Sequence, residues 1–150
     1  MRESASLNRA AVQATLHCLT GCAIGEVLGM VVATSLAWGN AASIAISIVL
    51  AFCFGYALTL SPVLRAGVPL RRALGLTVAS DTVSIAVMEI VDNGFILLVP
   101  GALAAGLGDG LFWWSLAASL ALAFVVALPV NRRLIARGRG HAVVHELHAH

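Results

Sequence analysis

The chain has 150 residues, of which 60% are hydrophobic and 11% are charged, and its mean hydropathy is +0.96. This composition excludes an ordinary soluble domain and is typical of a membrane protein. The formal net charge of +2 is small, and we expect no nucleic-acid partner. The three cysteines all lie in apolar segments, which argues against a disulfide framework.

A helix needs about 20 mostly apolar residues to cross the hydrocarbon core of a bilayer. Four segments meet this requirement: 11–36, 41–60, 73–91 (or as far as 99) and 111–130. Proline and glycine mark the breaks between them. The sequence therefore predicts an all-α polytopic membrane protein with four transmembrane helices. We expect one membrane domain over 11–130, between an N-terminal cytoplasmic segment (1–10) and a cytoplasmic tail (131–150).

The first span carries polar side chains in the stretch "HCLTGCAIGEVLGM" (17–30). Cys18, Cys22 and Glu26 follow one another at intervals of four residues, so they share one helix face. An acid in a membrane is costly unless it is paired, protonated or bound to an ion. We interpret His17, Cys18, Cys22 and Glu26 as candidate metal ligands. The alternative for the thiols is that they are small buried hydrophobic side chains.

Glycines form a second series on the first span, next to the thiols. Gly21, Gly25 and Gly29 repeat the Gly-xxx-Gly spacing that lets two membrane helices approach closely. We expect these three residues to serve helix packing.

The third span contains the stretch "SDTVSIAVMEIVDN" (80–93), which holds three acids. Asp81, Met88 and Asp92 lie on one face, and Glu89 lies about 80° from Asp81 at 100° per residue. No arginine occurs at these depths, which leaves protons or a bound cation to compensate the acids. We predict that Asp81, Glu89 and Asp92 form a proton or ion pathway and that Met88 is a metal ligand.

The first and third spans cross the membrane in the same direction. Counting from the start of each span, Asp81 is level with Cys18, Glu89 is near Glu26, and Asp92 is near Met30. The polar faces of the two spans are therefore expected to form one shared pathway.

The end of the third span is ambiguous at "VDNGF" (91–95). We expect the helix to break there, which would leave a re-entrant or interfacial segment at 95–107. Irregular backbone at that depth has to be covered by protein or line a cavity.

The tail "NRRLIARGRGHAVVHELHAH" (131–150) is basic and rich in histidine. His141 and His145 are four residues apart, and such a pair on a helix can chelate one divalent metal ion. The arginines of the tail also suit lipid headgroups and membrane orientation.

All nine cationic residues are arginines, and all nine fall on one side of the four-span arrangement. The positive-inside rule assigns that side, with both termini, to the cytoplasm. Trp38, Trp113 and Trp114 fall at the opposite boundary, where amphipathic rings are enriched.

The strings "HCLTGCAIGEVLGM", "FGYALTL", "DTVSIAVMEIVDN" and "PVNRRLIARGRGHAVVH" together resemble a bacterial family of four-helix membrane proteins, catalogued as domain of unknown function 4396. The resemblance covers roughly residues 15–145 and implies a multi-pass protein of the bacterial inner membrane. It transfers no reaction, ligand or catalytic residue, although annotation of relatives leans towards copper. In general shape the chain is also similar to small mercury-uptake proteins, whose cysteine pair is spaced differently.

Several functions stay open at this point. The first is binding or transport of a soft transition metal, most plainly copper, because thiolate, thioether and imidazole suit such ions. The alternatives are an accessory or structural subunit, a proton-coupled transporter of another solute, and a membrane thiol oxidoreductase. The last is disfavoured because no CxxC motif occurs and a disulfide across one helical turn is strained. A chain this short buries little interior, so we expect a homo-oligomer in the lipid bilayer.

Overall fold

The computed structural model describes residues 1–137, and they form four long helices and one short 3₁₀ helix. The long helices are α1 (Arg2–Ser35), α2 (Asn40–Arg65), α3 (Leu70–Leu98) and α4 (Gly110–Ala136), and the 3₁₀ helix is η1 (Ala102–Ala104). Each long helix is long and apolar enough to cross a membrane. The prediction of an all-α, four-span, multi-pass membrane protein is confirmed.

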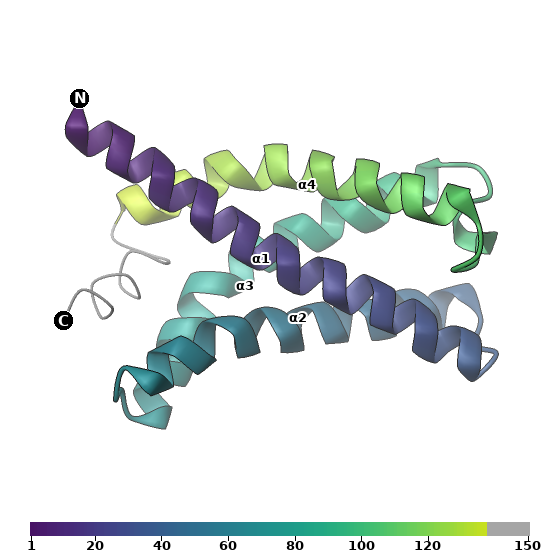
Figure 1. Ribbon diagram of the computed structural model, residues 1–150, viewed down its shortest axis with the longest axis horizontal. Coiled ribbons are helices and arrows are strands. Elements are labelled where there is room, and N and C mark those ends of the chain that lie inside the picture. The colour runs from purple at the N-terminus through teal and green to yellow at the C-terminus, as the bar shows by residue number, and fades with distance from the viewer. Residues whose placement is uncertain (138–150) are drawn as a thin grey trace.

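The four helices form an antiparallel bundle (Figure 1). α1 packs against α2 and α4, and α3 packs against the same two helices, so α1 and α3 face each other diagonally. Residues 36–39 and 66–69 are short connections, which favour antiparallel neighbours. Consequently α1 and α3 cross in the same direction, and their polar faces can meet in the centre of the bundle.

The arginines of the described residues are concentrated at one end of the bundle. The start of α1, the α2–α3 connection and the end of α4 lie together at this end (Figure 1). They carry the arginines of the described residues: Arg2, Arg9, Arg65, Arg71, Arg72, Arg132, Arg133 and Arg137. We call this the basic end, and the other end the outer end.

All four long helices extend beyond their predicted spans at the basic end, and α1 and α4 extend furthest. α1 already begins at Arg2, so the segment predicted as a separate N-terminus is helical. α4 continues to Ala136, where Asn131 donates a 2.9 Å hydrogen bond to Thr15 Oγ1. Arg132 Nε donates to Asn8 Oδ1 at 2.7 Å. These two contacts attach the extension of α4 to α1.

The expected break in the third span is wrong. α3 continues through residues 91–95 to Leu98, and the chain turns only at Gly101, whose φ is 82°. The Asn93 side-chain amide donates to the Glu89 backbone carbonyl oxygen at 3.0 Å, so this polar side chain finds a partner within its own helix. The segment 95–107 is therefore divided: its first four residues belong to α3, and the rest forms a loop that contains η1.

Glycines bring α1 and α2 into close contact. A Cβ at Gly21 would lie 2.7 Å from Gly55 Cα, and one at Gly25 would lie 2.5 Å from Ala51 Cα. A Cβ at Gly29 would lie 2.7 Å from Ser47 Cα. We call Gly21, Gly25 and Gly29 the glycine seam. Small residues at such positions let membrane helices gain van der Waals contact between backbones.

Candidate functional site

Four acidic side chains are buried in the centre of the bundle. Their exposed fractions are 8% for Glu26, 0% for Asp81, 4% for Glu89 and 1% for Asp92. Glu26 comes from α1, and the other three come from α3. The bundle thus brings together acids from its two diagonal helices, as the matched faces of the first and third spans predicted.

Glu26, Glu89 and Asp92 form a group that we call the outer acid cluster. Glu26 lies within hydrogen-bonding reach of Asp92. Ser119 of α4 donates to Asp92 Oδ1, and Asn93 donates to Glu89 Oε2 at 3.2 Å. Glu89 lies near Glu26, as expected, whereas Asp92 also faces Glu26 rather than Met30.

The outer acid cluster has unused hydrogen-bonding capacity. Glu26 Oε1, Glu89 Oε1 and Asp92 Oδ2 are buried and accept no hydrogen bond from any described residue. The arginines of residues 1–137 lie towards the basic end, away from this cluster. Carboxyl groups in such surroundings need protons or a bound cation to be stable.

Asp81 belongs to a second group closer to the basic end, which we call the inner group. His17 Nε2 lies 2.9 Å from Thr59 Oγ1, and Thr59 is within hydrogen-bonding reach of Asp81. Ser80 Oγ donates to Asp81 Oδ1 at 2.8 Å. Thr59 of α2 therefore links the imidazole of α1 to the carboxyl group of α3.

Two cysteine thiols lie between the outer acid cluster and the inner group. Cys22 is within hydrogen-bonding reach of Glu89, and Cys18 lies beside Asp81 and Ser84. Both thiols are free and buried. The protonatable side chains of α1 and α3 therefore follow one another from Glu26 to His17.

The metal-ligand prediction has incomplete geometric support. Cys18, Cys22 and Met88 share one buried cluster, so soft donors are close together. However, residues 1–137 contain no group of three or more His, Cys, Asp and Glu side chains that could hold a metal ion. His141 and His145 lie outside the described residues.

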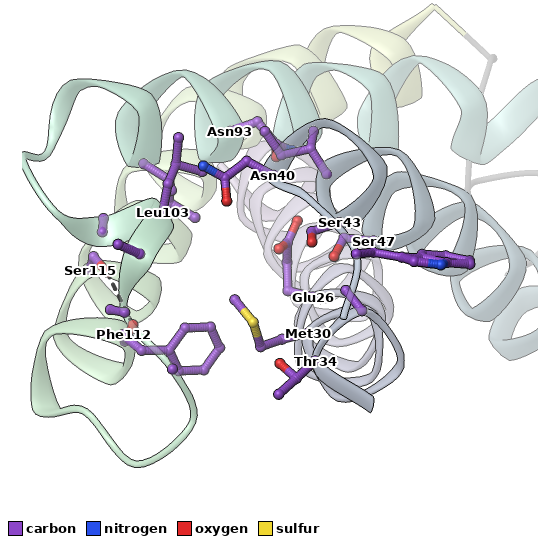
Figure 2. A pocket seen from close by; sticks show the side chains of 18 of the residues that line it. Glu26, Met30, Thr34, Asn40, Ser43, Ser47, Asn93, Leu103, Phe112 and Ser115 are labelled. Carbon is purple, nitrogen blue, oxygen red and sulfur yellow. Dashed lines mark hydrogen bonds between the residues drawn. The ribbon is translucent and has the colours of Figure 1, made fainter. Parts of the chain in front are cut away.

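A cavity of about 410 Å³ opens next to the outer acid cluster, and we call it the outer cavity. It lies between α1, α2, the end of α3, η1 and the start of α4. Figure 2 shows the Glu26 carboxyl group directed into it, with Met30 beside Glu26 and Phe112 across from both. Of the four buried acids, Glu26 is the one that lines the outer cavity.

The chain matches the family model of the domain of unknown function DUF4396 over residues 7–140. The chain belongs to this family. The DUF4396 match covers the outer acid cluster, the thiols, the inner group and the outer cavity. No curated protein and no solved structure matches the chain.

Several residues of the site in this DUF4396 protein could not be assigned to it from the sequence, and its serines suggested only bonds to helix backbones. Thr59, Asn93 and Ser119 contact the acids, and Ser43 and Ser47 line the outer cavity. Serine and threonine are common in membrane helices, where they bond to their own backbone, as Ser115 does with Leu111. Their residue type alone therefore gave no signal, whereas acids and cysteines stand out in an apolar span.

Proposed function

We propose that this protein translocates protons across the membrane through the centre of its bundle. The observation that carries the proposal is the sequence of protonatable side chains from the outer cavity to the inner group. From Glu26 to His17 it covers nine residues of α1, or about 14 Å along the helix axis at 1.5 Å per residue. Chains of acids and histidines at this depth are typical of proton relays in pumps and transporters.

A purely structural role for the acids is the main alternative. The glycine seam already explains the close packing of α1 on α2, and it involves no acidic side chain. The buried oxygens of Glu26, Glu89 and Asp92 that accept no hydrogen bond from described residues add nothing to packing. Isolated polar groups in hydrocarbon lower stability, so a functional role accounts for them better.

Proton influx into lipid vesicles tests the proposal. The purified protein is reconstituted with a pH-sensitive dye inside, and a potassium gradient with valinomycin drives protons inward. We expect influx above that of empty vesicles for the parent and for Glu3→Gln, an exposed acid at the basic end. Asp81→Asn should lower the protein-dependent rate about tenfold or more, since loss of a positioned proton-transfer group costs this much.

Two results would overturn the proposal. One is influx into parent vesicles that is no faster than into empty ones. The other is equal influx for the parent and Asp81→Asn, which would mean that protons cross elsewhere.

Transport of a soft metal ion, with copper as the first choice, is a second candidate. The shared buried cluster of Cys18, Cys22 and Met88 favours it, because thiolate and thioether ligands select Cu(I). As cargo, the ion would travel along the same face of α1 that carries the acids. The absence of a three-ligand group within residues 1–137 ranks this candidate second.

Elemental analysis after copper loading under reducing conditions separates the two candidates. Copper transport predicts near-stoichiometric metal in the parent and in Cys53→Ser, whose thiol is exposed on the bundle surface. The Cys18→Ser/Cys22→Ser variant should then retain none. Equal copper in all three proteins, or none in any, would remove the metal candidate.

Location and assembly are part of the proposal. The arginine distribution supports cytoplasmic termini, and the resemblance to a bacterial family of membrane proteins suits the inner membrane. The buried acids of the proposed pathway all belong to one protomer. A homo-oligomer stays a prediction.

A further inference from the structure

We infer that the outer cavity binds a small organic cation of the ammonium class. The inference rests on the proposed function for its role, because such a cation would occupy the outer end of the proposed proton pathway. Binding itself can be measured without any proton movement.

The Glu26 side chain is the first argument. It is 8% exposed and it lines the outer cavity. Figure 2 shows its side chain at the wall of the outer cavity, close to Ser43. A carboxyl group at a cavity wall is suited to a donor that arrives with a ligand.

The charge of the lining is the second argument. Glu26 is the one ionisable residue among those that line the outer cavity, and Glu89 and Asp92 lie behind it. An anionic ligand would meet only repulsion from these acids, and a neutral ligand would leave Glu26 without compensation. A cation provides the opposite charge that the cavity lacks.

The size and walls of the outer cavity favour an organic cation over a metal ion. Its volume of about 410 Å³ is far larger than an ion, and pockets for small organic molecules have about 300–1,000 Å³. The walls include the apolar side chains of Ile44, Ile96, Leu103 and Phe112. These surfaces can cover an alkyl group, and an aromatic ring such as Phe112 attracts a nearby ammonium group.

Neutral polar side chains complete the site around Glu26. Ser43 and Ser47 line the cavity from α2, and Asn93 lines it from α3 (Figure 2). Their oxygens can accept further hydrogen bonds from a primary ammonium group, which has three donors. One carboxylate, several neutral acceptors and an apolar wall together match an alkylammonium ion.

Calorimetric titration of the protein in lipid nanodiscs tests the inference with butylammonium as the probe. Butanol and butanoate serve as neutral and anionic analogues of similar size, and empty nanodiscs correct for partition into lipid. We expect butylammonium to bind about tenfold or more tightly than butanol, and butanoate not to bind.

Two variants test the assignment to Glu26. Glu26→Gln should weaken butylammonium binding about tenfold or more, while Glu3→Gln should bind like the parent. If Glu26→Gln fails to fold, Phe112→Leu should instead weaken binding severalfold while leaving Glu26 in place. Thermal unfolding of each variant shows which case applies.

Equal binding of butylammonium and butanol, or unchanged binding in a folded Glu26→Gln, would overturn the inference. Absence of butylammonium binding combined with normal proton influx would overturn this inference alone. Absence of both would overturn the proposed function as well.

Discussion

Asp92 is a buried acid whose burial lowers the stability of the fold, although the proposed function needs it. It is 1% exposed, lies beside Glu26, and accepts a hydrogen bond from Ser119. Two acids this close to each other, far from the arginines, cost free energy that the protein would save with neutral side chains. Such a cost is typical of functional sites, where activity and stability trade off against each other.

Replacement of Asp92 by asparagine should separate stability from activity. Asp92→Asn keeps the size of the side chain and an oxygen for Ser119, but removes the charge near Glu26. We expect the free energy of unfolding to stay unchanged or to rise by about 1 kcal/mol, while vesicle proton influx falls. Thermal unfolding in detergent measures the first effect. A clear loss of stability would show that the acid holds the fold together.

The residue types that can be predicted from sequence are those that are rare in lipid. Asp81, Glu89 and Asp92 are conspicuous because a charged group in a span is costly, and their spacing on one helix gives their common face. Thr59 lies on another helix, and its contact with His17 bridges 42 positions in the chain. Only the packing of α2 between α1 and α3 reveals it.

The contact between α1 and α2 depends on the absence of side chains at the glycine seam. Gly25 faces the backbone of Ala51, which cannot move away as a flexible side chain could. Gly75 of α3, in contrast, has nothing within 4 Å of an added Cβ. Gly75 is therefore a control for Gly25: both are helical glycines, but only Gly25 lies against a neighbouring helix.

Substitution of each glycine by alanine should have effects of opposite sign. Gly25→Ala should lower the free energy of unfolding by about 1–3 kcal/mol, because the added methyl group overpacks the interface. Gly75→Ala should leave it unchanged or raise it by up to about 1 kcal/mol, because alanine is the better helix former. Chemical unfolding in detergent gives both values. Equal effects at both positions would contradict the packing described for α1 and α2.

The unexpected continuity of α3 shows where helix prediction fails. Asparagine and glycine next to each other are typical of turns in soluble proteins. In a membrane, however, a backbone group without a partner is so costly that the helix continues wherever its neighbours permit it. Asn93 and Gly94 therefore stay helical, and the chain turns at Gly101, at the outer end.

The whole chain was predictable in outline because the bilayer imposes strong constraints. Length and hydropathy gave four spans, and short connections gave antiparallel neighbours. The diagonal placement of α1 and α3 was not implied by these rules. It depends on the close contact of α1 with α2 and on the packing of α4 against both odd-numbered helices.

The proposed orientation of the bundle rests on the arginines at the basic end and can be tested in intact bacterial cells. Gly108 lies exposed in the outer loop, and Ala136 lies exposed at the basic end. Gly108→Cys should react with a membrane-impermeant maleimide in intact cells, whereas Ala136→Cys should react only after the cells are opened. The reverse pattern would contradict the cytoplasmic assignment of the basic end.

Infrared difference spectroscopy of the protein in lipid vesicles tests the central claim most directly, namely that the buried acids exchange protons with water. Spectra of the parent between acidic and alkaline buffers should contain carboxyl C=O bands, and Asp81→Asn and Glu89→Gln should each remove a different one. Glu3→Gln should remove only a band of an exposed acid. If no band depends on Asp81 or Glu89, the acids are sealed from water and the proposed proton pathway is wrong.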